Sequence, residues 1–146
     1  MFEVEAKRDR AKYIEAEHML LALAADRNGS AAKAMMESGL DHERLDKALQ
    51  EEHRRTLAFA GMSAPSKELV EATELESHLT FGTSAKSALR RGLIATREAR
   101  RGRRARISDT ELLIGILQAD LGTVPRALAI AGIDRDALIA RARSSE

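Results

Sequence analysis

Two charged clusters in this sequence combine residue types and spacings that suit ligand binding. In the first, Glu17 and His18 stand directly before the apolar run Met19-Leu20-Leu21. A carboxylate at that place could accept a cationic group of a ligand. A glutamate in the first turn of a helix is also favoured by the helix dipole alone. The pattern therefore leaves both a binding role and a purely structural role open for Glu17.

The second cluster is the arginine-rich segment 97–106. Guanidinium groups there could contact phosphates of nucleic acid or of a phosphorylated protein. A solvated helix end, with arginines near the terminal carbonyls, is the alternative interpretation. The net charge of +1 and the 3% of aromatic residues argue against nucleic acid as the partner. The candidate phosphate contacts are Arg100, Arg101, Arg103 and Arg104.

The residue types that catalysis, metals or cofactors require are missing or badly spaced. There is no cysteine, and the four histidines lack the spacing of metal ligands. The nucleotide-binding pattern G-x-x-x-x-G-K-[ST], the pattern G-x-S-x-G and the pattern H-E-x-x-H do not occur. We therefore expect no enzyme, no metal and no cofactor. No apolar run resembles a signal peptide or a membrane span, which favours a cytoplasmic protein.

The elements that must position these residues are repeated within the chain at an offset of 93 residues. The matches are mostly glycines, aspartates and apolar residues, the types that fix a fold. Segments 3–49 and 96–142 are therefore predicted to be one unit built twice and packed about a pseudo-twofold axis. Matched pairs include Glu5 and Glu98, Ile14 and Ile107, Leu20 and Leu113, Gly29 and Gly122, Gly39 and Gly132, Asp41 and Asp134, and Leu45 and Leu138.

The periodicity predicts helices almost throughout, so the expected fold class is all-α, with two four-helix repeats. In the first unit we expect helices over 3–12, 16–27 and 30–37, and a long helix after Asp41. In the second, Ser108-x-x-Glu111 has the spacing of a capping box. No segment alternates with period two, so no sheet is expected. The predicted N-caps are Ser30, Asp41, Thr83, Ser108, Thr123 and Asp134.

One domain over residues 1–146 is expected, with repeat one at about 3–60 and repeat two at about 81–146. Between them, 61–66 is predicted to be a linker and 67–78 an extra helix, with Leu69, Ala72, Leu75 and Leu79 on one side. We expect that helix to cover the edge of the core, either within the chain or across a swapped homodimer.

The order of these motifs resembles the N-terminal repeat domain of the Clp/Hsp100 AAA+ unfoldases. The resemblance covers most of the chain except about residues 50–80. It is carried by the following segments: 13–21 (YIEAEHMLL), 29–34 (GSAAKA), 38–40 (SGL), 81–86 (FGTSAK), 98–99 (EA), 112–115 (LLIG) and 122–127 (GTVPRA).

The resemblance implies a non-catalytic interaction domain of the chaperone and proteolysis machinery. Its partners would be Clp protease or chaperone components, adaptors, or tagged substrate proteins, and it could compete for Clp ligands. In this family the glutamate before the histidine can bind the guanidinium of phosphorylated arginine, a fork of donors that a carboxylate matches well. A small nucleic-acid-binding regulator using 97–106 is the alternative. The ligand residues implied are Glu17, His18, Phe81, Thr83, Lys86, Thr110 and Glu111.

The sequence also departs from the family pattern at both expected sites. The first unit lacks about ten residues of the opening helix, so the family's Phe-Thr element has no counterpart before Glu3. In the second unit Thr110 and Glu111 stand at the Glu-His positions. Gly82 replaces the threonine after Phe81, and Thr83 follows one place later. A phosphoarginine site is therefore incomplete in both halves.

Overall fold

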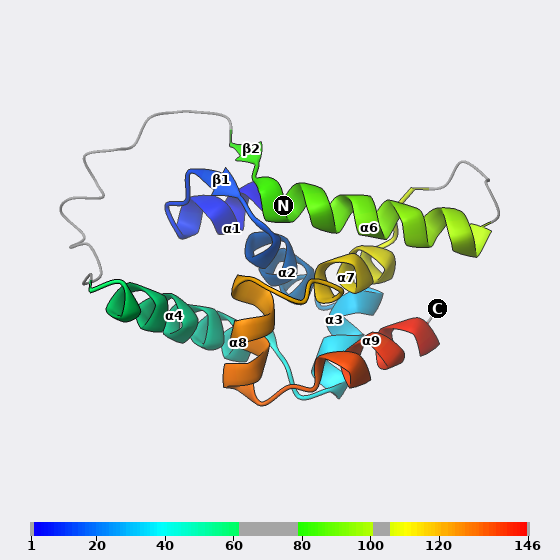
Figure 1. Cartoon of the computed structure of the whole chain (residues 1–146). Helices are drawn as coiled ribbons and strands as arrows, with labels where there is room; N and C mark the ends of the chain where they lie inside the picture. The colour runs from blue at the N-terminus through cyan, green and yellow to red at the C-terminus, as the bar shows by residue number, and fades with distance from the viewer. Residues whose placement is uncertain (1, 62–78, 101–105, 146) are drawn as a thin grey trace.

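The computed structural model describes residues 2–61, 79–100 and 106–145, which form helices joined by short connections (Figure 1). The all-α prediction is confirmed. The helices are α1 (Phe2–Arg8), α2 (Ala16–Ala25), α3 (Ser30–Glu37), α4 (His42–Phe59), α6 (Thr83–Arg100), α7 (Asp109–Leu117), α8 (Thr123–Ala131) and α9 (Arg135–Ser144), and the strands are β1 (Tyr13–Ile14) and β2 (Thr80–Phe81).

The helix starts follow the 93-residue offset of the sequence. Helices α2, α3 and α4 each begin 93 residues before α7, α8 and α9. The stop signals match too, because Gly39 and Gly132 both adopt the left-handed conformation, with φ of 84° and 72°. Asp41 accepts a hydrogen bond from the Arg44 amide at 2.7 Å, and Asp134 accepts from two amides of α9. These two predicted N-caps are confirmed.

Three other predicted N-caps are wrong by one residue. Ser30, Thr83 and Thr123 are the first residues of their helices, and a glycine precedes each one. Glycine is tolerated at an N-cap but supplies no side-chain acceptor. In α3 a distant residue supplies it, because the Ala31 amide donates to Asp109 Oδ2 at 3.0 Å. Such a cap from another helix has no local sequence signal.

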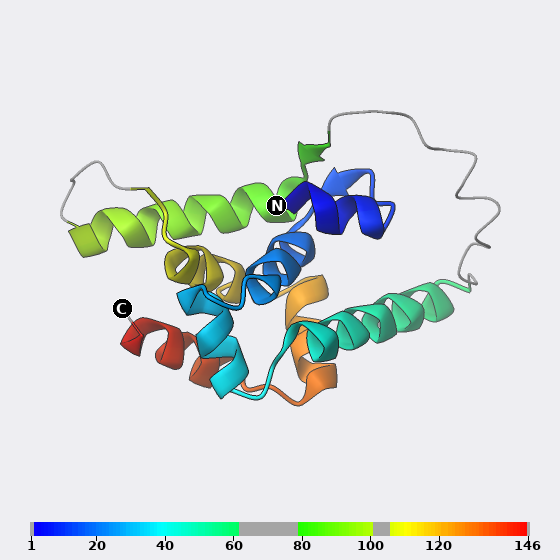
Figure 2. The same cartoon turned by 180° about the vertical axis from the view of Figure 1, so that it is seen from behind.

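The core lies where the two units meet. Helix α2 packs on α7 in the middle of the molecule, α4 packs on α8, and α3 packs on α9. Figures 1 and 2 show these pairs side by side from the front and from behind. Exchanging the two units turns the α4–α8 contact into the α9–α3 contact, as a pseudo-twofold arrangement requires. The predicted core is confirmed, since the following residues are all buried: Leu20, Leu23, Leu45, Leu113, Ile116 and Leu138.

Helices α6 and α7 cross at very short range because glycines line the contact. A Cβ atom added to Gly115 would lie 2.5 Å from the Ala88 carbonyl oxygen and 2.7 Å from the Gly92 amide nitrogen. The Arg91 side chain also donates from Nε to the Gly115 carbonyl at 2.7 Å. Only a residue without a side chain fits at Gly115, so α6 lies directly against α7.

Two segments differ from the expected local structure. The first helix ends at Arg8 rather than near residue 12, because Arg10 has a positive φ of 55°. The expectation of no sheet is also wrong, because β1 and β2 form a short parallel pair, with Tyr13 opposite Thr80 and Ile14 opposite Phe81. Two residues are too few to show alternation, so the sequence pattern could not reveal this pair.

Some predictions lie outside the described residues: the helix over 67–78, most of the linker before it, and Arg101, Arg103 and Arg104. For Arg100 the structure gives only its place as the last residue of α6.

Candidate functional site at the starts of helices α2 and α6

The β1–β2 pair brings together two helix starts that are far apart in the sequence. The Gly82 amide donates to the Ile14 carbonyl at 2.8 Å, one residue beyond the paired strands. Helix α2 begins two residues after Ile14, and α6 begins directly after Gly82. Figure 1 shows α1, β1 and β2 gathered at the beginning of α6. The predicted residues Glu17 and Thr83 are therefore on neighbouring helix starts.

The carboxylate of Glu15 occupies the start of α6. Its Oε2 accepts a hydrogen bond from the Ser84 amide at 3.2 Å and a second one from the Ser84 hydroxyl. The Ser84 hydroxyl in turn accepts from the Ala16 amide at 2.9 Å, which ties the two helix starts together. The amide at a helix start is a common position for bound anions. In this protein an internal carboxylate holds that position.

Gly82 leaves the space that the Glu15 side chain fills. A Cβ atom at Gly82 would fall within 1.8 Å of Glu15 Oε1, so any larger residue would displace the carboxylate. The position of the Glu15 carboxylate therefore depends on glycine at position 82. Sequence reasoning missed Glu15 and Ser84 as site residues, because their contact spans 69 positions and leaves no local pattern.

Glu17 is half-buried beside this contact. Burial raises the pKa of the Glu17 carboxyl, and the negative charges of Glu15, Glu52 and Asp9 raise it further. A carboxylate surrounded by other carboxylates is stabilised by any cation that approaches it. The surroundings of Glu17 therefore favour a cationic ligand group over a neutral one.

His18 performs a structural task at this helix start. The residue is 3% exposed, and its Nδ1 accepts a hydrogen bond from the Glu15 amide at 2.9 Å. An accepting Nδ1 carries no proton, so Nε2 carries it and faces Asp9 Oδ2 at 3.6 Å. Burial lowers the pKa of His18, which matches a neutral ring. Both ring nitrogens are thus directed at groups of the protein itself.

Three candidates from the second half of the chain lie in β2 and in the first turn of α6. Thr83 and Lys86 are exposed in its first turn, and Phe81 is 37% exposed in β2. The Phe81 ring meets Phe2 edge to face, with 6.5 Å between ring centroids. These residues flank Ser84, so they border the same surface as Glu15 and Glu17.

The corresponding residues of the second unit are inside the molecule. Thr110 and Glu111 are 2% and 3% exposed. Glu111 Oε2 accepts from the Thr96 hydroxyl at 2.6 Å and from the Ser108 amide at 2.9 Å, while the Glu111 amide donates to Ser108 Oγ at 3.1 Å. The predicted capping box is confirmed. This carboxylate closes a helix end in the core and faces no open surface.

The described residues contain neither a metal-binding cluster nor a membrane-spanning helix. Across 2–61, 79–100 and 106–145, no group of three or more histidine, cysteine, aspartate or glutamate side chains is arranged to hold a metal ion. Among the helices in these ranges, none has the length and hydrophobicity that crossing a membrane demands.

Comparison with known proteins places this arrangement in a family. No curated protein matches the chain. The family model described as the Clp repeat (R) N-terminal domain matches residues 3–92. That match covers more than half of the 146 residues, and it includes Glu15, Glu17, both strands and the start of α6. The chain belongs to the Clp repeat N-terminal domain family, whose members are non-catalytic interaction domains.

Proposed function

We propose that this domain docks protein partners of the Clp system, adaptors or tagged substrates, by holding an arginine guanidinium at Glu17. The observation that carries the proposal is the half-buried Glu17 carboxylate, whose pKa is raised by burial and by neighbouring carboxylates. A guanidinium brings the compensating charge and a planar fork of donors. A domain that holds such ligands also competes for them with other Clp N-terminal domains.

The same geometry bears on whether the arginine is phosphorylated. A phosphoryl group would need the Ser84 amide, which already donates to Glu15. Binding of phosphoarginine therefore requires the Glu15 carboxylate to move away, whereas an unmodified arginine adds a positive charge beside both glutamates. We therefore include both forms of the ligand in the proposal and expect unmodified arginine to bind more tightly.

The experiment is a fluorescence polarisation titration with three labelled peptides of one sequence, carrying arginine, phosphoarginine or citrulline at the same place. Citrulline keeps the shape of arginine without its charge. We expect binding of the arginine peptide and at least about tenfold weaker binding of the citrulline peptide, the range for hydrogen bonds to charged groups.

The matched variants are Glu17→Gln and Glu43→Gln. Both residues are first-turn glutamates, but Glu43 lies in the first turn of α4 and pairs with Lys47 at the surface. Glu17→Gln should abolish the preference for arginine, and Glu43→Gln should leave it unchanged. Equal binding of the arginine and citrulline peptides by the parent protein, or an unchanged preference in Glu17→Gln, contradicts the proposal.

The nucleic-acid alternative depends mainly on arginines outside the described residues and remains a prediction.

A further inference from the structure

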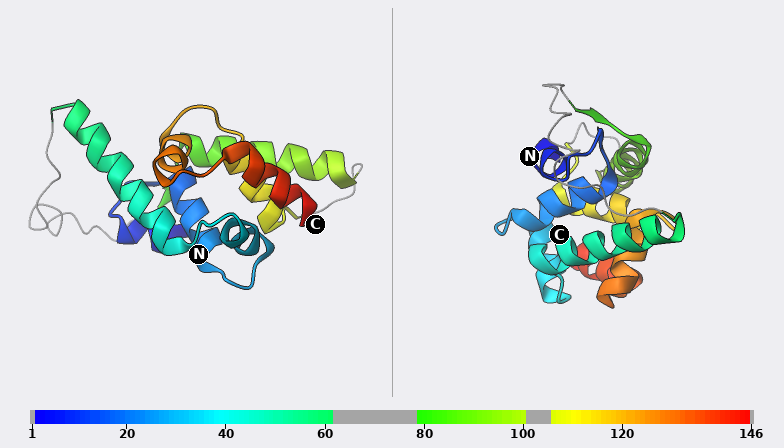
Figure 3. Two further views of the ribbon diagram at one scale, coloured as in Figure 1. Left: turned by 90° about the horizontal axis from the view of Figure 1, so that it is seen from below. Right: turned by 90° about the vertical axis from the view of Figure 1, so that its left-hand side faces the viewer.

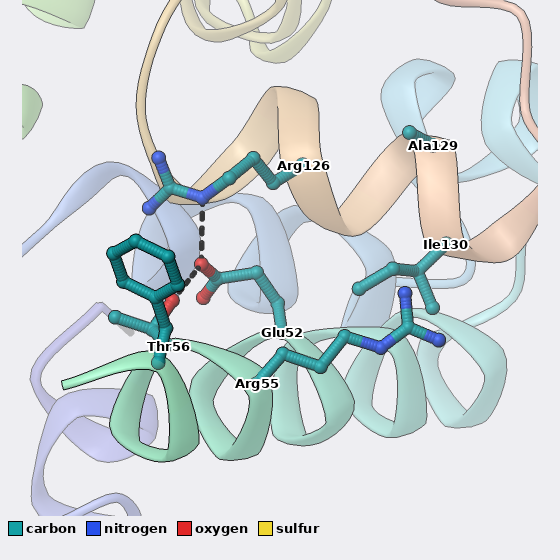
Figure 4. A pocket seen from close by; sticks show the side chains of 7 residues that line it. Glu52, Arg55, Thr56, Arg126, Ala129 and Ile130 are labelled. Atoms are coloured by element: carbon teal, nitrogen blue, oxygen red, sulfur yellow. Dashed lines mark hydrogen bonds and ion pairs between the residues drawn. The ribbon is translucent and has the colours of Figure 1, made fainter. Parts of the chain in front are cut away.

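A pocket of about 580 Å³ opens between α4 and α8, away from the contact of Glu15 with Ser84. Its α4 wall comes from one face of the last two helical turns, Glu52 to Phe59, and its α8 wall from Arg126, Ala129 and Ile130 (Figure 4). Its volume lies in the range typical of ligand pockets.

An ion pair between the buried Glu52 and the exposed Arg126 forms the polar end of this pocket. Glu52 is 3% exposed, and its Oε1 accepts from Arg126 Nε at 2.8 Å and from the Thr56 hydroxyl at 2.8 Å. The pair fixes the Arg126 guanidinium by its Nε side, and Figure 4 shows the two Nη groups directed away from Glu52. The second unit does not repeat this ion pair, because the positions of Glu52 and Arg126 correspond to Ser145 and Lys33.

A second arginine lies at the opposite end of the pocket. Arg55 extends along α4 toward Ile130 in Figure 4. Its Nε donates to Glu51 at 2.9 Å on the outer side of the helix. Among the contacts within the described parts of the chain, neither Arg55 nor Arg126 uses an Nη group. Both ends of the pocket therefore present guanidinium donors to an incoming ligand.

The other lining residues are apolar. Ala129 and Ile130 form the α8 side, and Phe59, the last residue of α4, is 97% exposed. Figure 3 shows this end of α4 projecting away from the other helices. Phe59, Ala129 and Ile130 together offer an incoming apolar side chain a surface against which it can be buried.

We infer that this pocket, here called the α4–α8 pocket, binds a segment of a partner protein with an apolar side chain between two carboxylates. Each carboxylate meets one guanidinium, and the apolar side chain lies on Ala129, Ile130 and Phe59. A small ligand with one carboxylate would meet only one end, whereas a peptide reaches both. This site does not involve Glu17, so it adds a second docking surface to the proposed function.

The test uses three labelled heptapeptides with central triads Asp-Leu-Glu, Asp-Ser-Glu and Lys-Leu-Lys, titrated by fluorescence polarisation into the full chain. The first should bind at least about fivefold more tightly than the other two, the gain expected from charge pairs together with apolar burial. Equal affinities for the three peptides would overturn the inference.

The matched variants are Arg55→Glu and Arg54→Glu. Both arginines pair with Glu51, but Arg54 does not line the pocket. Arg55→Glu should weaken the Asp-Leu-Glu peptide by at least about fivefold, and Arg54→Glu by less than about twofold. Ala129→Glu, at an exposed position of α8, should weaken it as much as Arg55→Glu. Thermal unfolding checks that each variant is folded. Equal losses of peptide affinity in Arg54→Glu and Arg55→Glu would contradict the inference.

Two further measurements separate other occupants of the pocket. Glu17→Gln removes a charge that also acts on Glu52, but Glu17 does not line the pocket, so the variant should change the Asp-Leu-Glu affinity by less than about twofold while it abolishes the arginine preference. The failure of one site therefore does not imply the failure of the other. Sedimentation velocity tests whether a second copy of the chain occupies the pocket. We expect the parent chain to form no dimer through Arg55. A dimer of the parent chain that dissociates in Arg55→Glu would show that a second copy fills the pocket, and it would overturn the inference.

Discussion

The starts of α2 and α7 have the same place in the repeat but different tasks. At α7, Ser108 and Glu111 close the helix end inside the core, and the position that matches Glu17 holds the buried Thr110. At α2, Glu15 and His18 form a reciprocal capping box, and the Glu15 side chain also reaches the start of α6. The first unit thus keeps charged groups at a surface where the second has used them for stability. Under the proposed function, one copy of the repeat would bind the ligand and the other would support the fold.

The largest expected effect concerns the shared core. Leu113→Ala removes a fully buried side chain of α7 and should lower the free energy of unfolding by about 2–5 kcal/mol. Its counterpart Leu20→Ala should cost a similar amount, because both lie where the units meet. Denaturant unfolding measures both. Leu121→Ala, at a residue that is 89% exposed, is the control, and a loss below about 0.5 kcal/mol for Leu113→Ala would contradict the packing.

The next largest effect on stability is expected at a position where the two units carry different residues. Position 115 in α7 is glycine, while the corresponding position in α2 is the buried Ala22. Gly115→Ala should destabilise the fold by about 1–3 kcal/mol, because its Cβ would clash with the Ala88 carbonyl and with the backbone of Gly92. A stabilised or unchanged Gly115→Ala variant in the same unfolding assay would show that α6 can move away from α7 without cost.

Substitutions of the N-cap residues of α7 and α2, Ser108 and Glu15, should affect different properties of the protein. Ser108→Ala removes a cap and should cost about 1 kcal/mol of stability without changing peptide affinity. Glu15→Ala frees the Ser84 amide and should raise the affinity for the phosphoarginine peptide by about fivefold, since that amide and hydroxyl become available to the phosphate. Polarisation titration and thermal unfolding of both variants check this. Equal phosphoarginine affinity with and without Glu15 would remove the blocking role.

The smallest effect is the pH dependence of Glu17. Its pKa is raised in the folded state, so the ionised form is disfavoured by folding and costs stability above that pKa. Glu17→Gln should therefore raise the melting temperature by about 1 °C at pH 7. The difference should shrink as the pH falls through the raised pKa and vanish below the ordinary pKa of glutamate. A difference that grows on acidification would mean that the ionised carboxylate stabilises the fold.

The sequence predicted the repeated architecture well, because helix starts and core positions depend on local patterns that recur. Asp41, Asp134 and the Ser108–Glu111 box were all identified from spacing alone. The site was predicted only in part. Glu17, Phe81, Thr83 and Lys86 lie around it, but the Glu15–Ser84 contact and the β1–β2 pair join distant segments, and nothing local encodes them. The α4–α8 pocket was missed for the same reason, since Glu52 and Arg126 are 74 positions apart.

The long span of the contact between Glu15 and Ser84 also has a kinetic consequence. Closing a loop of 69 positions is slower than forming the local helix pairs of each unit, so the two helix starts should meet late in folding. In a nascent or partly unfolded chain, the helices of one unit would form before the proposed ligand site at the starts of α2 and α6. Peptide binding then reports completed folding of the chain, and recovery of binding after dilution from denaturant should lag behind recovery of helical circular dichroism.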